Sequence, residues 1–177
     1  FVPGQHEGEI VVVDISAVNA TPTATLQCHR SAVHAIAAND RWLATASSTG
    51  TLIRVARLNT GEQVSENKGD EVPKFLRRGL DKANIWSLAL SKSDKLAVLS
   101  DKGTLHVYGI GDHAANERHS LAKFPLAPKY FGDEWSSARV KTGSKDEAIV
   151  GWVADDACVI IKKNESLWEK YLPVSYT

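Results

Sequence analysis

The chain contains no methionine and only two cysteines, and its 21 basic residues are balanced by 21 acidic ones. Cys28 and Cys158 are far apart and show no C-x-x-C spacing, so neither a disulfide framework nor a zinc site is predicted, and a reducing compartment is the default. A generic polyanion binder needs a strongly basic surface, which zero net charge argues against. Any phosphate binding must therefore come from a local cluster of side chains.

Long hydrophobic runs are also missing. No apolar run approaches the roughly 18 residues that would span a bilayer, and residues 1–4 lack the charged and apolar regions of a signal peptide. Because position 1 is not methionine, we expect an internal or C-terminal piece of a longer protein.

Catalytic motifs are absent as well. The sequence has no G-x-S-x-G elbow, no H-E-x-x-H and no P-loop lysine, so we predict neither an enzyme nor a cofactor. A single Arg-Arg-Gly without interleaved aromatic residues does not predict a nucleic-acid binder.

What the sequence does contain is a series of short β-branched and apolar segments that end in turn residues, a pattern typical of strands. The expected strands are residues 9–15, 24–27, 32–37, 42–47, 51–58, 84–90, 96–100, 104–110, 136–140, 148–153, 157–162 and 167–172. The polar stretches 62–70 and 112–119 are expected to be loops. The five tryptophans, Trp168 among them, are interpreted as packing residues between units.

Two of these stretches repeat each other. Leu43–Val55 (LATASSTGTLIRV) matches Leu96–Tyr108 (LAVLSDKGTLHVY) without a gap. Short strands that recur at a fixed period predict a β-propeller, which has four strands per blade. The fold class is therefore predicted to be all-β. The expected division is the end of one blade (1–28), two blades (29–76 and 77–124) and a more divergent last blade (125–177), with residues 136–140 as the first strand of that last blade.

Between the two repeats lies the segment Phe75–Gly79, with Arg77 and Arg78 side by side. Successive side chains of an extended chain point to opposite faces, so adjacent arginines can serve two neighbouring pockets. The planar guanidinium suits bidentate capture of phosphate or carboxylate. The alternative is a structural role, in which the two arginines pair with Glu71, Asp81 or Asp101.

Four stretches together resemble the PROPPIN family of seven-bladed WD-repeat-like propellers: LATASSTGTLIRV, LRRGLDKANIWSLALS, LAVLSDKGTLHVYGI and PLAPKYFGDEWSSA. The resemblance covers nearly the whole chain and corresponds to the fourth to seventh blades of the family. Its most specific element is Leu76–Gly79, which is similar to the Leu-Arg-Arg-Gly branch.

The resemblance implies a peripheral membrane adaptor that binds phosphatidylinositol 3-phosphate and phosphatidylinositol 3,5-bisphosphate and acts in autophagy and endosomal or vacuolar membrane traffic. It implies a cytoplasmic protein attached to pre-autophagosomal, endosomal or vacuolar membranes. The implied partners are phosphoinositide-containing membranes, an autophagy-related protein and the remaining blades of the same propeller. The alternative is a protein-interaction propeller that binds no lipid.

Carried over by position, the resemblance also implies two lipid headgroup sites. The first would consist of His29, Ser47, Thr51 and Arg77, and the second of Arg78, Ser100, Thr104 and His106. The sequence repeat makes the serine and the threonine of the two sites equivalent. Hydroxyl, imidazole and guanidinium groups all offer directed donors to phosphate oxygens. If the two histidines bind as cations, binding should strengthen near pH 6.

One departure concerns the membrane-inserting loop of the family. Residues 112–119 stand in its place, and they are short and offer only Ala114 and Ala115 as apolar residues. This loop is therefore either partly absent from the chain or a weak membrane anchor.

Overall fold

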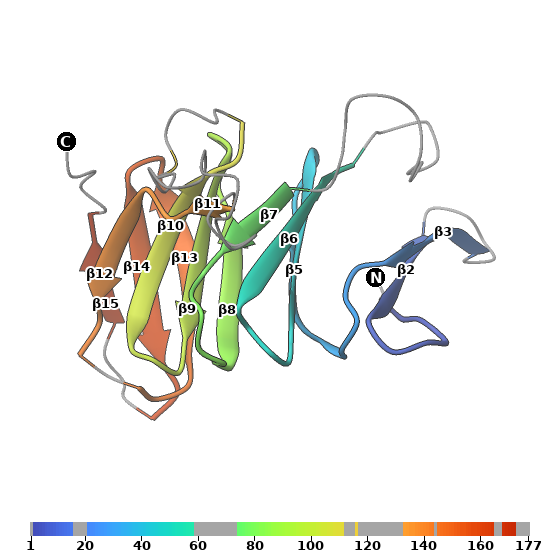
Figure 1. Ribbon diagram of the computed structural model, residues 1–177. Coiled ribbons are helices and arrows are strands. Elements are labelled where there is room, and N and C mark those ends of the chain that lie inside the picture. Colours follow the sequence, from blue (N-terminus) through green and yellow to red (C-terminus); the bar gives the residue numbers. More distant parts are fainter. Residues whose placement is uncertain are drawn as a thin grey trace, which may run out of the picture.

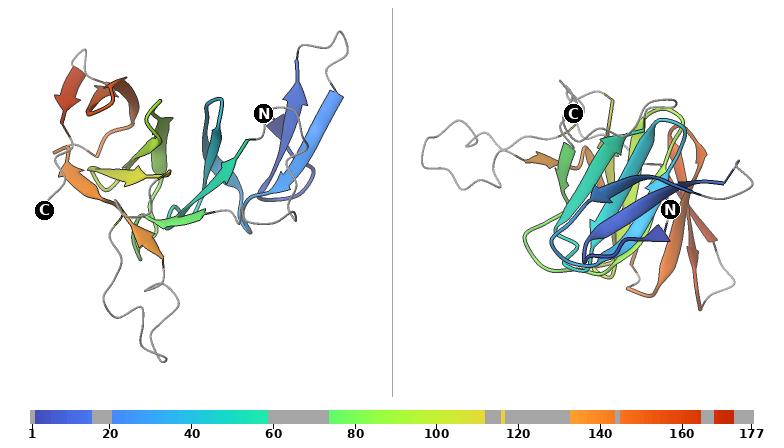
Figure 2. Two further views of the ribbon diagram at one scale, coloured as in Figure 1. Left: turned by 90° about the horizontal axis from the view of Figure 1, so that it is seen from above. Right: turned by 90° about the vertical axis from the view of Figure 1, so that its right-hand side faces the viewer.

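The computed structural model describes residues 2–15, 21–58, 74–111, 116, 133–143, 145–164 and 168–172. Every regular element in these ranges is a β-strand, and the strands form four sheets. The sheets follow one another in an arc, from the N-terminal sheet to the C-terminal one (Figures 1 and 2). The expectation of an all-β fold is confirmed, and the described ranges contain no helix that could cross a membrane.

The first sheet joins β1 (Val2–Pro3), β2 (Glu9–Asp14) and β3 (Thr21–Gln27) in that order. The second has the order β11-β7-β6-β5-β4, built from β4 (Val33–Ala38), β5 (Trp42–Ser47), β6 (Leu52–Arg57), β7 (Lys74–Arg77) and β11 (Glu134–Trp135). The third has the order β12-β10-β9-β8, built from β8 (Ile85–Leu90), β9 (Lys95–Ser100), β10 (Thr104–Gly109) and β12 (Ala138–Lys141). The fourth joins β13 (Ala148–Ala154), β14 (Ala157–Lys162) and β15 (Trp168–Tyr171).

Most strands lie where alternation and turn residues place them, but the membership of one strand differs from the prediction. The strand expected over residues 136–140 is β12, and it pairs with β10 instead of opening the last blade. Its Ala138 and Val140 pack with Leu105 and Val107 of β10 in one apolar cluster, which fixes the strand on the third sheet. The predicted last blade therefore loses its first strand to the preceding sheet.

Smaller differences concern one strand end and two short strands. β3 begins at Thr21, three residues earlier than expected. The two-residue strands β1 and β11 were not predicted, and β11 runs parallel to β7. Apart from Asn116, the expected loops 62–70 and 112–119 lie outside the described residues.

The sequence repeat is also a structural repeat. In each copy a glycine closes the turn by donating its backbone N–H to a serine carbonyl, Gly50 to Ser47 at 2.9 Å and Gly103 to Ser100 at 3.1 Å. Both glycines have a positive φ, 59° and 64°, a conformation that glycine adopts without the steric cost of a side chain. The two turns therefore present equivalent groups at the same end of the second and third sheets.

Strand alternation makes the sheets pack face to face. On β10, Tyr108 faces the second sheet and is buried in a cluster with Leu76, while Leu105 and Val107 face the fourth sheet. The third sheet is thus covered on both faces, as in a stack of propeller blades. Side chains at the ends of such strands remain near the surface and can form sites between adjacent sheets.

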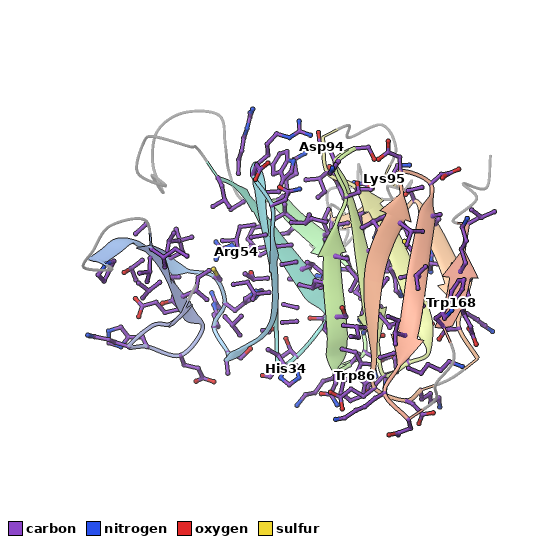
Figure 3. The ribbon with its side chains drawn as sticks, turned by 180° about the vertical axis from the view of Figure 1, so that it is seen from behind. His34, Arg54, Trp86, Asp94, Lys95 and Trp168 are labelled. Carbon is purple, nitrogen blue, oxygen red and sulfur yellow. The ribbon has the colours of Figure 1, made fainter. Side chains whose placement is uncertain are left out.

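The outer face of the fourth sheet is different. Ile149, Ile161 and Trp168 lie directly opposite one another across β13, β14 and β15, and they are 61%, 50% and 65% exposed. Trp168 points away from the other sheets (Figure 3). Within the described part of the chain this tryptophan is therefore largely exposed, and its interpretation as a packing residue between units stays a prediction.

Replacement of Gly50 by alanine is expected to destabilise the fold. A Cβ at this position would lie 1.9 Å from the carbonyl oxygen of Ala83, and the positive φ would be strained in addition. We expect Gly50→Ala to lower the free energy of unfolding by about 1–3 kcal/mol or more, measured by urea denaturation.

Gly79→Ala is the matched control. It replaces a nearby glycine whose added Cβ would meet no atom within 4 Å. An equal loss of stability in the two variants would show that the turn geometry of Gly50 is not what matters.

Candidate functional site

An open hollow of about 970 Å³ lies between the first and second sheets. Three residues of the predicted first site line it, namely His29, Ser47 and Thr51. His29 Nε2 lies 2.9 Å from Thr45 Oγ1, and Ser47 Oγ lies 2.8 Å from Thr49 Oγ1. The loop before β4 and the β5–β6 turn therefore bring three of the four expected residues to one place.

Arg77, the fourth expected residue, does not line the hollow. Its Nε donates to Asp133 Oδ2 at 2.5 Å, and the two side chains are only 14% and 22% exposed. In the register of β6 and β7, Arg77 is opposite Leu52, which does line the hollow. Opposite residues share one face of a sheet, so the backbone directs Arg77 to the correct side while its guanidinium is engaged by Asp133.

Arg54 is a functional candidate that the sequence reasoning missed. It lines the same hollow, between the first and second sheets (Figure 3). Its Nη1 donates to the carbonyl oxygens of Gln27 and Cys28, both at 2.6 Å, and its guanidinium lies 5.1 Å from the ring centroid of Phe75. Among the described residues its buried Nε has no hydrogen-bond partner. The signal in the sequence was an arginine inside the otherwise apolar strand LIRVA.

Arg78 is buried and is held by backbone carbonyl groups. Its Nε donates to the carbonyl oxygen of Gly50 at 2.6 Å, and its Nη2 donates to that of Asp81. Burial lowers the pKa of Arg78, while Tyr108, Asp101 and Asp81 raise it. The guanidinium is thus fixed against the β5–β6 turn, and its hydrogen bond to Asp81 goes to the backbone carbonyl of that residue and not to its carboxylate.

The remaining residues of the second site share one face of the third sheet. Thr104 on β10 is directly opposite Ser100 on β9, and His106 is two residues further along β10. Ser100 is 1% exposed, and its Oγ has no hydrogen-bond partner in the described part of the chain. The guanidinium of Arg78 is close enough to lower the pKa of His106. The structure therefore brings all four residues of the second site together.

Both predicted histidines are disfavoured as cations. Burial is the main cause that lowers the pKa of His106 to about 3, and Arg78 and Arg139 add to it. Burial also lowers the pKa of His29, a shift that its bond to Thr45 opposes and Arg54 reinforces. His106 is therefore neutral at pH 6, so the expectation that it strengthens binding near pH 6 as a cation is not supported.

Ser136 is a second residue that sequence reasoning missed. It is 1% exposed, and its Oγ lies 3.2 Å from His106 Nδ1. A neutral imidazole has one donor and one acceptor. If the hydroxyl of Ser136 donates to Nδ1, the proton of His106 resides on Nε2.

No group of three metal-ligating side chains occurs within the described ranges.

Comparisons with known proteins agree with this architecture. SVP1-like protein 2 of Pichia angusta is 34% identical over 97% of this chain and 50% of its own length, and that of Debaryomyces hansenii is 33% identical over 97% and 46%. The structure of Kluyveromyces lactis Hsv2p matches with a TM-score of 0.66 at 28% identity, over 92% of this chain and 48% of that one. No family model matches the chain.

The fold and the repeated rim turns define a segment of a β-propeller. More particularly, the chain belongs to the PROPPIN family, as the resemblance of its sequence predicted. The chain spans about half the length of the curated relatives it matches.

The buried His106 is expected to make the protein sensitive to acid. Its pKa is about 3 in the folded protein and about 6.5 in an unfolded chain, so between these values the unfolded state binds the extra proton. Stability is therefore lost as the pH falls through this window, and about 2 kcal/mol of the free energy of unfolding should disappear between pH 7 and pH 5.

The His106→Gln variant tests this expectation, because glutamine does not titrate. Urea denaturation at pH 7 and pH 5 should show a smaller acid-induced loss in the variant than in the parent protein. An equal loss in both would assign the acid sensitivity to other groups.

Proposed function

We propose that the protein is a peripheral membrane adaptor that binds phosphatidylinositol 3-phosphate and phosphatidylinositol 3,5-bisphosphate through two sites on the rim of the propeller. The first site consists of His29, Ser47, Thr51 and Arg77, and the second of Arg78, Ser100, Thr104 and His106. Two weak sites on one rigid body that face one membrane gain avidity from their effective concentration.

The observation that carries the proposal is the arrangement around Ser100. A hydroxyl that is 1% exposed and lacks a partner among the described residues lies on the same face as Thr104 and His106, and the buried guanidinium of Arg78 is close enough to His106 to lower its pKa. Buried polar atoms are normally hydrogen-bonded, and a phosphate oxygen would supply the missing partner. The equivalent turn of the repeat lines the hollow of the first site, which supports two sites of one kind.

The wider role rests on the family. We infer that the full propeller has seven blades and that this chain supplies about the fourth to the seventh, with boundaries near residues 28 and 76 and with the last boundary moved from residue 124 to the segment between β12 and β13. The proposed setting is autophagy and endosomal or vacuolar membrane traffic, on the cytoplasmic face of those membranes. An autophagy-related protein is the proposed partner, and no catalytic activity is part of the proposal.

The second candidate function is a protein-interaction propeller whose arginines are structural. The ion pair of Arg77 with Asp133 and the backbone bonds of Arg78 favour it. The two functions differ in one measurable property, which is binding to 3-phosphoinositide vesicles.

Replacement of both arginines tests the proposal. The variant Arg77→Thr with Arg78→Thr should co-sediment with 3-phosphoinositide vesicles no more than with phosphatidylcholine vesicles, because each site loses its guanidinium. The control is Arg41→Thr with Arg57→Thr, which removes the same charge at the opposite ends of β5 and β6 and should bind like the parent protein.

Arg78 also stabilises the β5–β6 turn through its hydrogen bond to the carbonyl oxygen of Gly50, so circular dichroism must show that the variant is folded. A second variant avoids this difficulty by combining Arg77→Thr with Thr104→Val, one change in each site. Retention of vesicle binding by either folded variant would contradict the two-site proposal and favour the protein-interaction propeller.

A further inference from the structure

Two basic residues on β12 lie next to the second site. In the register of β10 and β12, Arg139 is directly opposite His106, and Lys141 is directly opposite Thr104. Directly opposite residues share one face of a sheet, with Cβ atoms about 4.5–5.5 Å apart. Arg139 contributes to the lowered pKa of His106, in agreement with this placement.

The same face carries the unpartnered hydroxyl. Ser100, Thr104 and Lys141 form one row across β9, β10 and β12. Ser100 is buried at the inner end of this row, and Lys141 is exposed at its outer end. A ligand that reaches the hydroxyl of Ser100 therefore extends along a row that ends at a lysine.

Because carboxylates lie near Arg78, this arginine alone does not give the second site the positive charge that a multiply charged anion requires. The carboxylates of Asp81 and Asp101 raise the pKa of Arg78. One buried oxygen of Asp101 has no hydrogen-bond partner in the described ranges. These carboxylates offset the single positive charge of Arg78. Two exposed cations on β12, Arg139 and Lys141, make the charge of this region positive and suit it to an anion that carries several negative charges.

We propose that Arg139 and Lys141 bind a second phosphate group of the ligand in the second site. Arg78, Ser100, Thr104 and His106 hold one phosphate, and the two β12 residues hold the other. The second site is therefore selective for an inositol ring with two ring phosphates besides the phosphodiester, in preference to a ring with one. This inference rests on the proposed function, because it assigns the ligand class of the same site.

The test measures the second site alone, in a protein that carries Arg77→Thr to silence the first site. Isothermal titration calorimetry uses two soluble headgroups, inositol 1,3-bisphosphate and inositol 1,3,5-trisphosphate. In this background, Arg139→Gln with Lys141→Gln should weaken the trisphosphate about ten- to a hundredfold, the loss expected for charge-assisted hydrogen bonds. Affinity for the bisphosphate should fall by less than about threefold, in line with the loss of screened surface charge.

The matched control is Arg41→Gln with Lys92→Gln, which removes two positive charges from the opposite end of the strands. Arg41 Nη2 donates to the carbonyl oxygen of Lys92, so both residues belong to that end. This variant should change neither affinity by more than about twofold, since both residues lie at the strand ends remote from Ser100 and solvent screens exposed charges over such separations.

The outcomes separate the inference from the proposed function. If the β12 variant weakens both headgroups equally, or no more than the control does, the inference is wrong while lipid binding stands. If it weakens binding only to vesicles and to neither soluble headgroup, Arg139 and Lys141 contact the bilayer surface and the inference is also wrong. If Arg78→Thr leaves every affinity unchanged, the proposed function itself fails.

Discussion

The hydrogen bond from the hydroxyl of Tyr108 to the carbonyl oxygen of Arg77, at 3.0 Å, joins the second and third sheets at the double arginine. The ring of Tyr108 is fully buried, and burial raises the pKa of its hydroxyl far above the ordinary value, so the group remains a donor at every physiological pH. This bond fixes β7 against β10. Both proposed sites depend on it, because it sets where Arg77 and Arg78 stand relative to the rim turns.

The repeat then determines what surrounds the two arginines. Gly50 and Gly103 allow two turns of the same form, and each turn starts from a buried serine at the end of a central strand. The structure uses the two copies differently. The first turn accepts the guanidinium of Arg78 on its backbone, while Ser100 in the second copy keeps a buried hydroxyl without a partner in the described part of the chain. Two turns of equivalent sequence therefore differ in their polar contacts: the backbone of the first holds a guanidinium, and the second leaves a buried hydroxyl available to a ligand.

Much of the fold followed from the sequence, because period-two alternation and turn residues are local signals. The central strands such as β5 and β14 lie at the predicted residues. The membership of β12 was not predictable, since which sheet a strand joins depends on distant apolar partners such as Leu105 and not on its own residues. The site followed in part. The grouping of Ser100, Thr104 and His106 is a consequence of register, whereas the engagement of Arg77 by Asp133 joins residues 56 positions apart and left no local signal.

That ion pair has a consequence for how ionic strength acts on the first site. An anion that binds Arg77 must displace the carboxylate of Asp133. The number of ion pairs made by this arginine then stays the same. Fewer counterions are released than a count of basic residues suggests, and the salt dependence of association is correspondingly shallow. Selectivity at such a position comes from geometry, because the carboxylate already satisfies the charge and only a better-shaped acceptor can displace it.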